Sequence, residues 1–142
     1  INGDYAIVGA RNDDDNGTDS GSVYIYERTS GNLWGNELKI TASDGAANDL
    51  FGSDVSISGD YVIVGARNDD DNGTDSGSVY IYERASGNTW GNEFKITASD
   101  GAANDLFGSA ISISGDYAIV GARRDDDNGT DSGSVYIYRI SG

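Results

Sequence analysis

Cysteine, histidine, methionine and proline are absent from the 142 residues of the chain. Without cysteine or histidine there is no thiol nucleophile, no Ser-His-Asp triad, no zinc site of the usual kind and no disulfide. Basic residues are also scarce, with 9 Lys and Arg against 24 Asp and Glu and a formal net charge of −15. Nucleic acid and anionic membrane surfaces both require positive charge, and no apolar run is long enough to cross a bilayer. We therefore expect neither nucleic-acid binding nor membrane insertion.

A repeat of 56 residues organises the sequence. When residues 1–86 are aligned with residues 57–142, 73 of the 86 pairs are identical. Such self-similarity indicates a repeat architecture. We place the units at residues 1–54, 55–110 and 111–142, the first lacking its first strand and the third lacking its last. We expect the chain to be a window onto a longer repeat protein or one protomer of an assembly, with further repeats or other copies of itself as partners.

The apolar runs are short, are bounded by Gly, Asn, Asp or Ser, and show no helical period, so we predict strands and no helix. In the complete unit, Val55–Ser58 and Phe94–Thr97 alternate, while Tyr61–Ala66 and Ser78–Tyr82 are apolar on both faces. A two-sided strand is covered on both faces when its sheet lies between two others. We therefore predict an all-β chain of tandem four-stranded antiparallel blades, in a partial β-propeller or a repeat array, rather than a two-sheet sandwich.

The two tryptophans stand beside glycines, Trp34 next to Gly35 and Trp90 next to Gly91. We expect both in turns. There we predict that they cap the outer edge of a blade, with stacking on a sugar as the alternative.

A Phe-Gly motif followed by a Val-Gly-Ala motif occurs twice at the same spacing. The first copy is Phe51-Gly52 with Val64-Gly65-Ala66, and the second is Phe107-Gly108 with Val120-Gly121-Ala122. These motifs resemble the FG-GAP repeat, which builds the propellers of integrin alpha-subunit heads and of many bacterial surface proteins. The resemblance implies β-propeller blades, an extracellular or cell-surface location, and a role in adhesion or ligand recognition. Where the family's motif closes with Pro, this chain has Arg11, Arg67 and Arg123, so we expect a less rigid bend there.

Half of the acidic residues lie in three copies of one polar loop, which in the complete unit runs from Arg67 to Gly77. Such close carboxylates repel one another unless water or a hard cation screens them. Calcium is the natural cation, because it takes about six to eight oxygen ligands from carboxylates, amides and carbonyls. The candidate ligands are Asn12, Asp13, Asp14, Asp15, Asn16 and Asp19; Asn68, Asp69, Asp70, Asp71, Asn72 and Asp75; and Asp125, Asp126, Asp127, Asn128 and Asp131.

Two ligand registers are open in these loops. In the first loop they are Asn12, Asp14, Asn16 and Asp19, which resembles Asp-x-Asp-x-Asp-Gly calcium loops, or else Asp13, Asp15 and Asp19. The third loop has Arg124 where the others have Asn12 and Asn68, so the first register predicts a weaker third site and the second predicts three similar sites. The resemblance supports calcium only in part, because integrins carry their calcium loop between the first two strands of a blade. The alternative is a solvated loop without an ion.

Each acidic loop also contains an Asn-Gly-Thr sequon, at Asn16, Asn72 and Asn128, which is a glycosylation signal. Two classes of function stay open. One is a calcium-dependent extracellular module that recognises a protein or glycan; the other is a structural protein whose near-identical blades assemble into a filament or array. An enzyme is the weakest interpretation, because nothing pairs the carboxylates with a distinct acid, base or nucleophile. We expect no catalytic residue.

Overall fold

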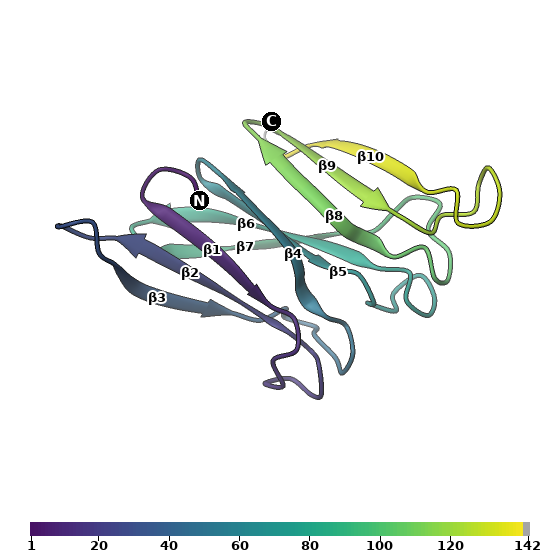
Figure 1. Cartoon of the computed structure of the whole chain (residues 1–142), viewed down its shortest axis with the longest axis horizontal. Helices are drawn as coiled ribbons and strands as arrows, with labels where there is room; N and C mark the ends of the chain where they lie inside the picture. Colours follow the sequence, from purple (N-terminus) through teal and green to yellow (C-terminus); the bar gives the residue numbers. More distant parts are fainter. Residues whose placement is uncertain (141–142) are drawn as a thin grey trace.

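The computed structural model describes residues 1–140, which form ten strands in three antiparallel sheets (Figure 1). The first sheet contains β1 (Tyr5–Ala10), β2 (Ser22–Arg28) and β3 (Trp34–Ile40). The second contains β4 (Phe51–Ser58), β5 (Tyr61–Ala66), β6 (Ser78–Ser86) and β7 (Thr89–Ile96). The third contains β8 (Phe107–Ser114), β9 (Tyr117–Ala122) and β10 (Ser134–Arg139). Within each sheet, strands that follow one another in the chain are neighbours.

The all-β prediction is confirmed for the described residues, which contain no helix. None of them therefore belongs to a helix that could span a membrane. Strand β5 and the loop 67–77 have their predicted bounds, whereas β4 and β8 begin four residues before the unit boundaries at 54/55 and 110/111. The division into units remains a prediction, and the last two residues of the third unit, 141–142, lie outside the described part.

The three sheets stack face to face, and the second is covered on both sides (Figure 1). Val62 and Val64 of β5 belong to the core shared with the first sheet, while Ile63 between them belongs to the core shared with the third. The three side chains are fully buried. This sandwiching explains why the strand is apolar on both faces, since successive side chains of a strand point to opposite sides.

Each interface between sheets contains a phenylalanine held edge-on by two tyrosines. Phe51 lies 5.2 Å from Tyr80 and 6.4 Å from Tyr82 between ring centroids, with interplanar angles of 77° and 86°. Phe107 meets Tyr136 and Tyr138 in the same way at 5.3 Å and 6.2 Å. Edge-to-face geometry suits the aromatic quadrupole and adds to the stabilisation from burial.

Glycines permit the closest approach between the sheets. A Cβ built on Gly9 would collide with the carbonyl oxygen of Gly52, and one on Gly65 would collide with that of Gly108. Gly52 and Gly108 both have a φ of +84°, a left-handed conformation that disfavours other residues. The glycines of the Phe-Gly and Gly-Ala motifs are therefore needed in pairs, one from each of two stacked sheets.

The alternation of β4 is explained by contacts with the next sheet. The polar side chains of Asp54, Ser56 and Ser58 accept hydrogen bonds from the backbone N–H groups of Ile111, Ile113 and Gly115, at 2.7, 3.2 and 3.2 Å. The polar face of β4 thus satisfies the open edge of β8 in the next sheet.

The expectation that the tryptophans lie in turns is wrong. Trp34 opens β3 and Trp90 lies in β7, because the turns come two or more residues earlier, at Gly31-Asn32 and Gly87-Asn88. Trp90 is buried and meets the ring of Tyr5 edge-on at 5.6 Å, which joins the second sheet to the first. Trp34 is exposed, since no described residue covers the outer face of the first sheet.

Replacing Gly65 with alanine is expected to destabilise the chain by about 1–3 kcal/mol or more, because the new methyl group must separate two backbones. Gly121→Ala is the matched control. It changes the equivalent residue of the third sheet, where the nearest atoms to a new Cβ are those of Ala110 at 3.6 Å, an ordinary contact. Urea unfolding of the two variants measures the difference. Equal losses of stability would contradict the proposed role of close sheet approach.

Candidate functional site

One aspartate of each acidic triplet shapes its own loop. In loop 67–77, the carboxylate of Asp70 accepts a hydrogen bond from the backbone N–H of Asp75 at 2.7 Å, and Asp75 has a φ of +52°. The same bond joins Asp14 to Asp19 at 2.8 Å and Asp126 to Asp131 at 2.6 Å. Side-chain acceptors of this kind favour tight turns over regular structure.

The loops also bind the sheets together through backbone hydrogen bonds. The carbonyl of Thr74 accepts from the N–H of Asn104 at 2.8 Å, and that of Ser76 accepts from the N–H of Phe107 at 2.9 Å. Thr18 and Ser20 make the equivalent bonds to Asn48 and Phe51. Loop 67–77 is therefore anchored to the segment that starts the next sheet.

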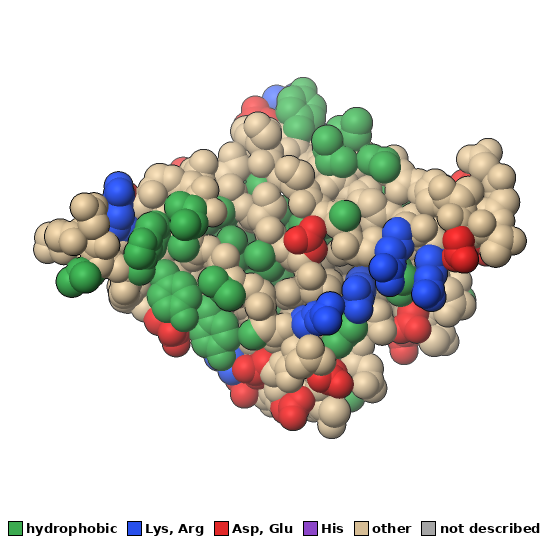
Figure 2. All heavy atoms as spheres, viewed as in Figure 1, with side chains coloured by type: hydrophobic (Ala, Val, Ile, Leu, Met, Phe, Trp, Pro, Cys, Tyr) green, Lys and Arg blue, Asp and Glu red, His purple; other side chains and the backbone are tan. Residues whose placement is uncertain are grey.

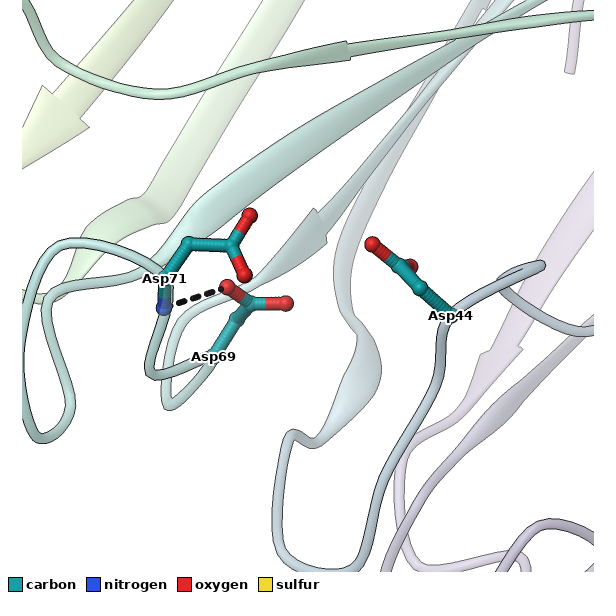
Figure 3. A group of neighbouring side chains, drawn as sticks. All are labelled: Asp44, Asp69 and Asp71. Atoms are coloured by element: carbon teal, nitrogen blue, oxygen red, sulfur yellow. Dashed lines mark hydrogen bonds between the residues drawn. The ribbon is translucent and has the colours of Figure 1, made fainter.

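The other two aspartates of the second triplet form a cluster with a residue from a different loop. Asp69 and Asp71 lie close to Asp44, which follows β3 (Figure 3). One carboxylate oxygen from each lies within 4.8 Å of the others, the only such group of three acidic side chains among residues 1–140. Asp69 is 3% exposed, whereas Asp44 and Asp71 are open to solvent on one side.

A lysine occupies the centre of this cluster. The Nζ atom of Lys95 lies 2.8 Å from Asp44, 2.9 Å from Asp69 and 2.7 Å from Asp71. It also lies 5.2 Å from the ring centroid of Tyr80, a favourable cation–π distance. The Tyr80 hydroxyl lies 2.8 Å from Asp44 and 3.1 Å from Asp69. Lys95 and Tyr80 are opposite each other on β7 and β6, so the sheet itself positions the two groups.

The charges in this cluster stabilise one another. Burial lowers the pKa of Lys95, but hydrogen bonds to Asp44, Asp71 and Asp69 outweigh it and raise that pKa. Burial tends to raise the pKa of Asp44, yet hydrogen bonds from Lys95 and Tyr80 bring it below its ordinary value. Burial and the nearby carboxylates raise the pKa of Tyr80. Near neutral pH Lys95 is therefore an ammonium, Asp44 a carboxylate and Tyr80 a neutral phenol.

The first loop has an incomplete version of the same cluster. Lys39 binds Asp13 at 3.1 Å and also binds Asp15, and the Tyr24 hydroxyl lies 3.3 Å from Asp13. The counterpart of Asp44 would precede the first residue of the sequence. Among the described residues this cluster has its lysine and two of the three carboxylates.

The third loop has the opposite defect. The Tyr136 hydroxyl lies 2.7 Å from Asp100 and 3.0 Å from Asp125, as in the second loop. The counterpart of Lys95 would follow the last residue of the sequence. The negative charge of Asp125, together with burial and the charge of Asp100, raises the pKa of Asp127. Repulsion among these carboxylates has no lysine to balance it within the described residues.

Comparison with protein families identifies the repeats in these sheets and loops. The FG-GAP repeat matches residues 1–26, 34–82 and 90–138, and its second and third segments start 56 residues apart. The chain belongs to the FG-GAP repeat family. The family suggested by the Phe-Gly and Gly-Ala motifs is thus confirmed, while comparison with curated proteins finds no match. FG-GAP repeats are commonly calcium-binding and are typical of extracellular or surface proteins.

The residues proposed as calcium ligands in this FG-GAP chain are divided between different roles. In the first loop, Asp13 and Asp15 meet Lys39, whereas Asp19 accepts a hydrogen bond from the Asn12 amide at 2.5 Å. The backbone N–H of Asn68 donates a hydrogen bond to the carbonyl of Asp49 at 3.3 Å, and the backbone N–H of Arg124 donates one to the carbonyl of Asp105 at 3.2 Å. Among the described residues, the carboxylate oxygens of Asp13, Asp15 and Asp19 do not form a converging group as those of the central cluster do, and both ligand sets remain predictions.

The sequon asparagines Asn16, Asn72 and Asn128 are exposed. The Nδ2 atom of Asn16 donates to the carbonyl of Ala42 at 3.5 Å, and that of Asn72 donates to the carbonyl of Ala98 at 3.4 Å. These bonds use the nitrogen that a glycan would occupy. Glycosylation stays a prediction.

Lys95→Gln is expected to destabilise the chain by about 1–3 kcal/mol at neutral pH, because it leaves buried Asp69 beside two unbalanced carboxylates. The sign of the pH dependence should also change. The lowered pKa of Asp44 contributes stability above its unfolded pKa, and the wild type loses that stability as the pH falls through the folded pKa. Without Lys95 the carboxylates repel, their pKa values rise, and mild acid should stabilise the variant.

Arg28→Gln is the control for this experiment. It removes the same charge and breaks the pair with Asp4, but both of those side chains are well exposed. Exposed ion pairs contribute about 0–1 kcal/mol. Urea unfolding between mildly acidic and neutral pH measures both variants. A stability loss in Lys95→Gln no larger than that of Arg28→Gln would show that the cluster does not depend on its lysine.

Proposed function

We propose that this FG-GAP chain is an extracellular or cell-surface module for adhesion or ligand recognition, and that its ligand is a protein or a glycan. The observation that carries the proposal is the presence of FG-GAP repeats across all three sheets. Three similar loops follow β1, β5 and β9, so a rigid stack presents them at the same end of each sheet. Loops on a rigid scaffold are a common arrangement for binding. Screening against extracellular glycans and proteins tests this function, and the absence of any ligand would contradict it.

We propose binding without catalysis. General acid–base chemistry needs groups with a pKa near the working pH. In the central cluster, the pKa values of Lys95 and Tyr80 are both raised, which moves these groups further from titration near neutrality. An ammonium that stays protonated is also a poor nucleophile.

The three sheets are proposed to be successive blades that repeat every 56 residues, in a partial propeller or an open array. Support comes from the covered second sheet, whose four strands follow the order expected of a blade. The first and third sheets have three strands each, and they lack different members of that set. Further repeats would supply the missing strands.

Calcium dependence is proposed for the acidic loops, and the third loop is where it can be tested without competition from a described lysine. In the central cluster Lys95 already contacts all three carboxylates, so a calcium ion could bind there only after the lysine left. The third loop brings Asp100, Asp125 and Asp127 near one another without a lysine among the described residues. Its oxygens would still have to move together to ligate one ion, since they do not converge as those of the central cluster do.

Asp127→Asn is expected to weaken calcium binding about tenfold or more, because it removes a charged oxygen ligand. Asp71→Asn changes the equivalent residue of the central loop and should leave the strongest calcium site intact. Calorimetric titration of the metal-free chain measures both. A larger effect from Asp71→Asn would place the ion in the central cluster instead, and no binding at millimolar calcium would leave the loops as solvated structure.

Self-assembly is the second candidate function, and the two end faces of the stack favour it. Tyr117, Ile119, Val135 and Ile137 are exposed on the third sheet, where their counterparts Tyr61, Ile63, Val79 and Ile81 in the second sheet are packed against the next one. The outer face of the first sheet contains Ala6, Val8, Tyr24 and Tyr26, counterparts of the covered Val62, Val64, Tyr80 and Tyr82. Figure 2 shows apolar side chains gathered over the first sheet and near the end of the third.

These two faces are complementary, because each interface inside the chain pairs the same two kinds of face. The third sheet of one copy would therefore stack on the first sheet of another. Such a head-to-tail contact uses different patches on each partner and generates filaments when it does not close into a ring. A cleft between β7 and β10, lined by Phe94, Ile96 and Tyr138, marks where a fourth strand would join the third sheet.

Ile137→Lys is expected to shift the chain toward monomer, because its counterparts Ile25 and Ile81 are only 0% and 6% exposed within the stack. Leu33→Lys is the control. Leu33 is as exposed as Ile137, at 68% against 69%, but it lies between β2 and β3, outside both buried cores. Light scattering over a range of protein concentrations measures the change. A wild-type chain that stays monomeric at every concentration would contradict self-assembly.

A further inference from the structure

Four arginines gather at one end of the stacked strands. Arg11, Arg67 and Arg123 directly follow β1, β5 and β9, and Arg124 is next to the last of them. These strands hold the same place in three successive sheets, so their ends fall side by side. Figure 2 shows the resulting row of basic side chains across one face of the molecule. We call Arg11, Arg67, Arg123 and Arg124 the arginine row.

The arginine row has no acidic partner in the described part of the chain. The ion pairs found there use Arg28, Lys39, Arg84 and Lys95. Within residues 1–140, the Arg11 side chain hydrogen-bonds the amide oxygen of Asn12, at 3.4 Å, and forms no ion pair. The Nε atom of Arg67 is buried and has no hydrogen-bond partner. In a chain with 9 basic and 24 acidic residues, four unpaired arginines side by side are unexpected.

Folding alone gives no reason for this arrangement. Like charges placed together repel one another. The pKa of Arg67 is lowered by burial and by the neighbouring charges of Arg11, Arg123 and Arg124. A buried donor without a partner also costs stability. An anionic ligand would relieve both penalties, since a guanidinium binds carboxylate or sulfate through two parallel hydrogen bonds.

We propose that the arginine row binds a linear acidic polysaccharide through its carboxylate or sulfate groups. This inference rests on the recognition function proposed above and specifies its ligand. Stacked sheets lie about 10 Å apart, so the guanidinium groups recur along a line and engage one extended chain at several points. Several weak contacts along one polymer give higher affinity than any one of them alone.

Other anionic polymers fit the row less well. Single-stranded nucleic acid usually needs aromatic side chains on which its bases stack. Exposed Tyr117 opens β9, at the opposite end of that strand from Arg123, and exposed Trp34 pairs with Arg28, away from the row. An acidic protein would need an apolar interface core, whereas Asn12 and Asn68, which directly follow two of the arginines, are polar. Polar flanks suit the hydroxyl groups of a sugar.

The test measures binding of the full chain to dextran sulfate and to oligogalacturonate, with neutral dextran as the uncharged probe and with chelator present to exclude calcium effects. The wild type should bind a charged probe and not dextran, and binding should weaken as salt rises. The sulfate and carboxylate probes identify which group is preferred. Arg67→Gln combined with Arg123→Gln should lower the affinity by about tenfold or more, through loss of charge-assisted hydrogen bonds.

The matched control combines Arg28→Gln with Arg139→Gln, which removes the same charge outside the row. It should retain the wild-type affinity within about twofold. Arg67→Lys keeps the charge but loses the two-pronged contact, so an intermediate affinity is expected. Circular dichroism and thermal unfolding verify that each variant is folded.

Three outcomes would overturn the inference. They are equal losses in the row and control variants, equal binding of oligoaspartate or a single-stranded oligonucleotide, and no binding of either charged polysaccharide. A screen of glycans and proteins with the same samples distinguishes failure of the arginine-row inference from failure of the proposed recognition function. A ligand whose binding does not depend on the arginine row would overturn the inference alone, whereas the absence of any ligand would overturn both.

Discussion

Backbone packs directly on backbone where Gly9 meets Gly52 and where Gly65 meets Gly108, and the rest of the structure depends on that spacing. With no side chain between them, the carbonyl of Ser76 can reach the N–H of Phe107, which anchors an acidic loop to the next sheet. The N–H of Phe51 makes the equivalent bond to the carbonyl of Ser20 in the preceding loop, while its ring packs on two tyrosines of its own sheet. Two kinds of glycine in the repeat thus determine how sheets, loops and core meet.

The acidic cluster is a property of two successive units rather than of one. Asp44 comes from the first unit, whereas Asp69, Asp71 and Lys95 come from the second. A complete cluster therefore requires an aspartate from the preceding unit and a lysine from the last strand of its own unit, and within the described residues only the second loop has both. This explains how three loops of nearly identical sequence have different charge balances.

Much of the fold could be predicted from the local pattern. The apolar run Tyr61–Ala66 and the polar loop after it have their expected bounds, because a short apolar run and the turn residues that bound it act over a few positions. The tryptophans were misplaced because neighbouring glycines suggested turns, while pairing with β2 and β6 keeps Trp34 and Trp90 in strands. Here tertiary pairing outweighs local propensity.

The candidate site was harder to predict, because its essential partners are distant in sequence. The closely spaced carboxylates of the acidic loop, among them Asp69 and Asp71, indicated that a cation balances them. The cation found there is Lys95, which lies more than twenty residues further along in β7, a strand whose alternating apolar and polar residues do not distinguish it from other strands. The role of Lys95 becomes visible only when the strands are paired, because the pairing of β6 with β7 places Lys95 opposite Tyr80. The arginine row is similar: three residues 56 positions apart become neighbours only once the sheets are stacked.

The polar face of β4 also has a consequence for how such a chain can grow. Its side chains occupy the N–H groups of Ile111 and Ile113 in β8 and of Gly115 just after it, so a foreign strand cannot use these donors. Unprotected edges are where β-proteins recruit one another into amyloid-like sheets. At this edge the repeat thereby favours face-to-face stacking over strand addition, which reduces the uncontrolled aggregation to which near-identical neighbouring sequences are prone.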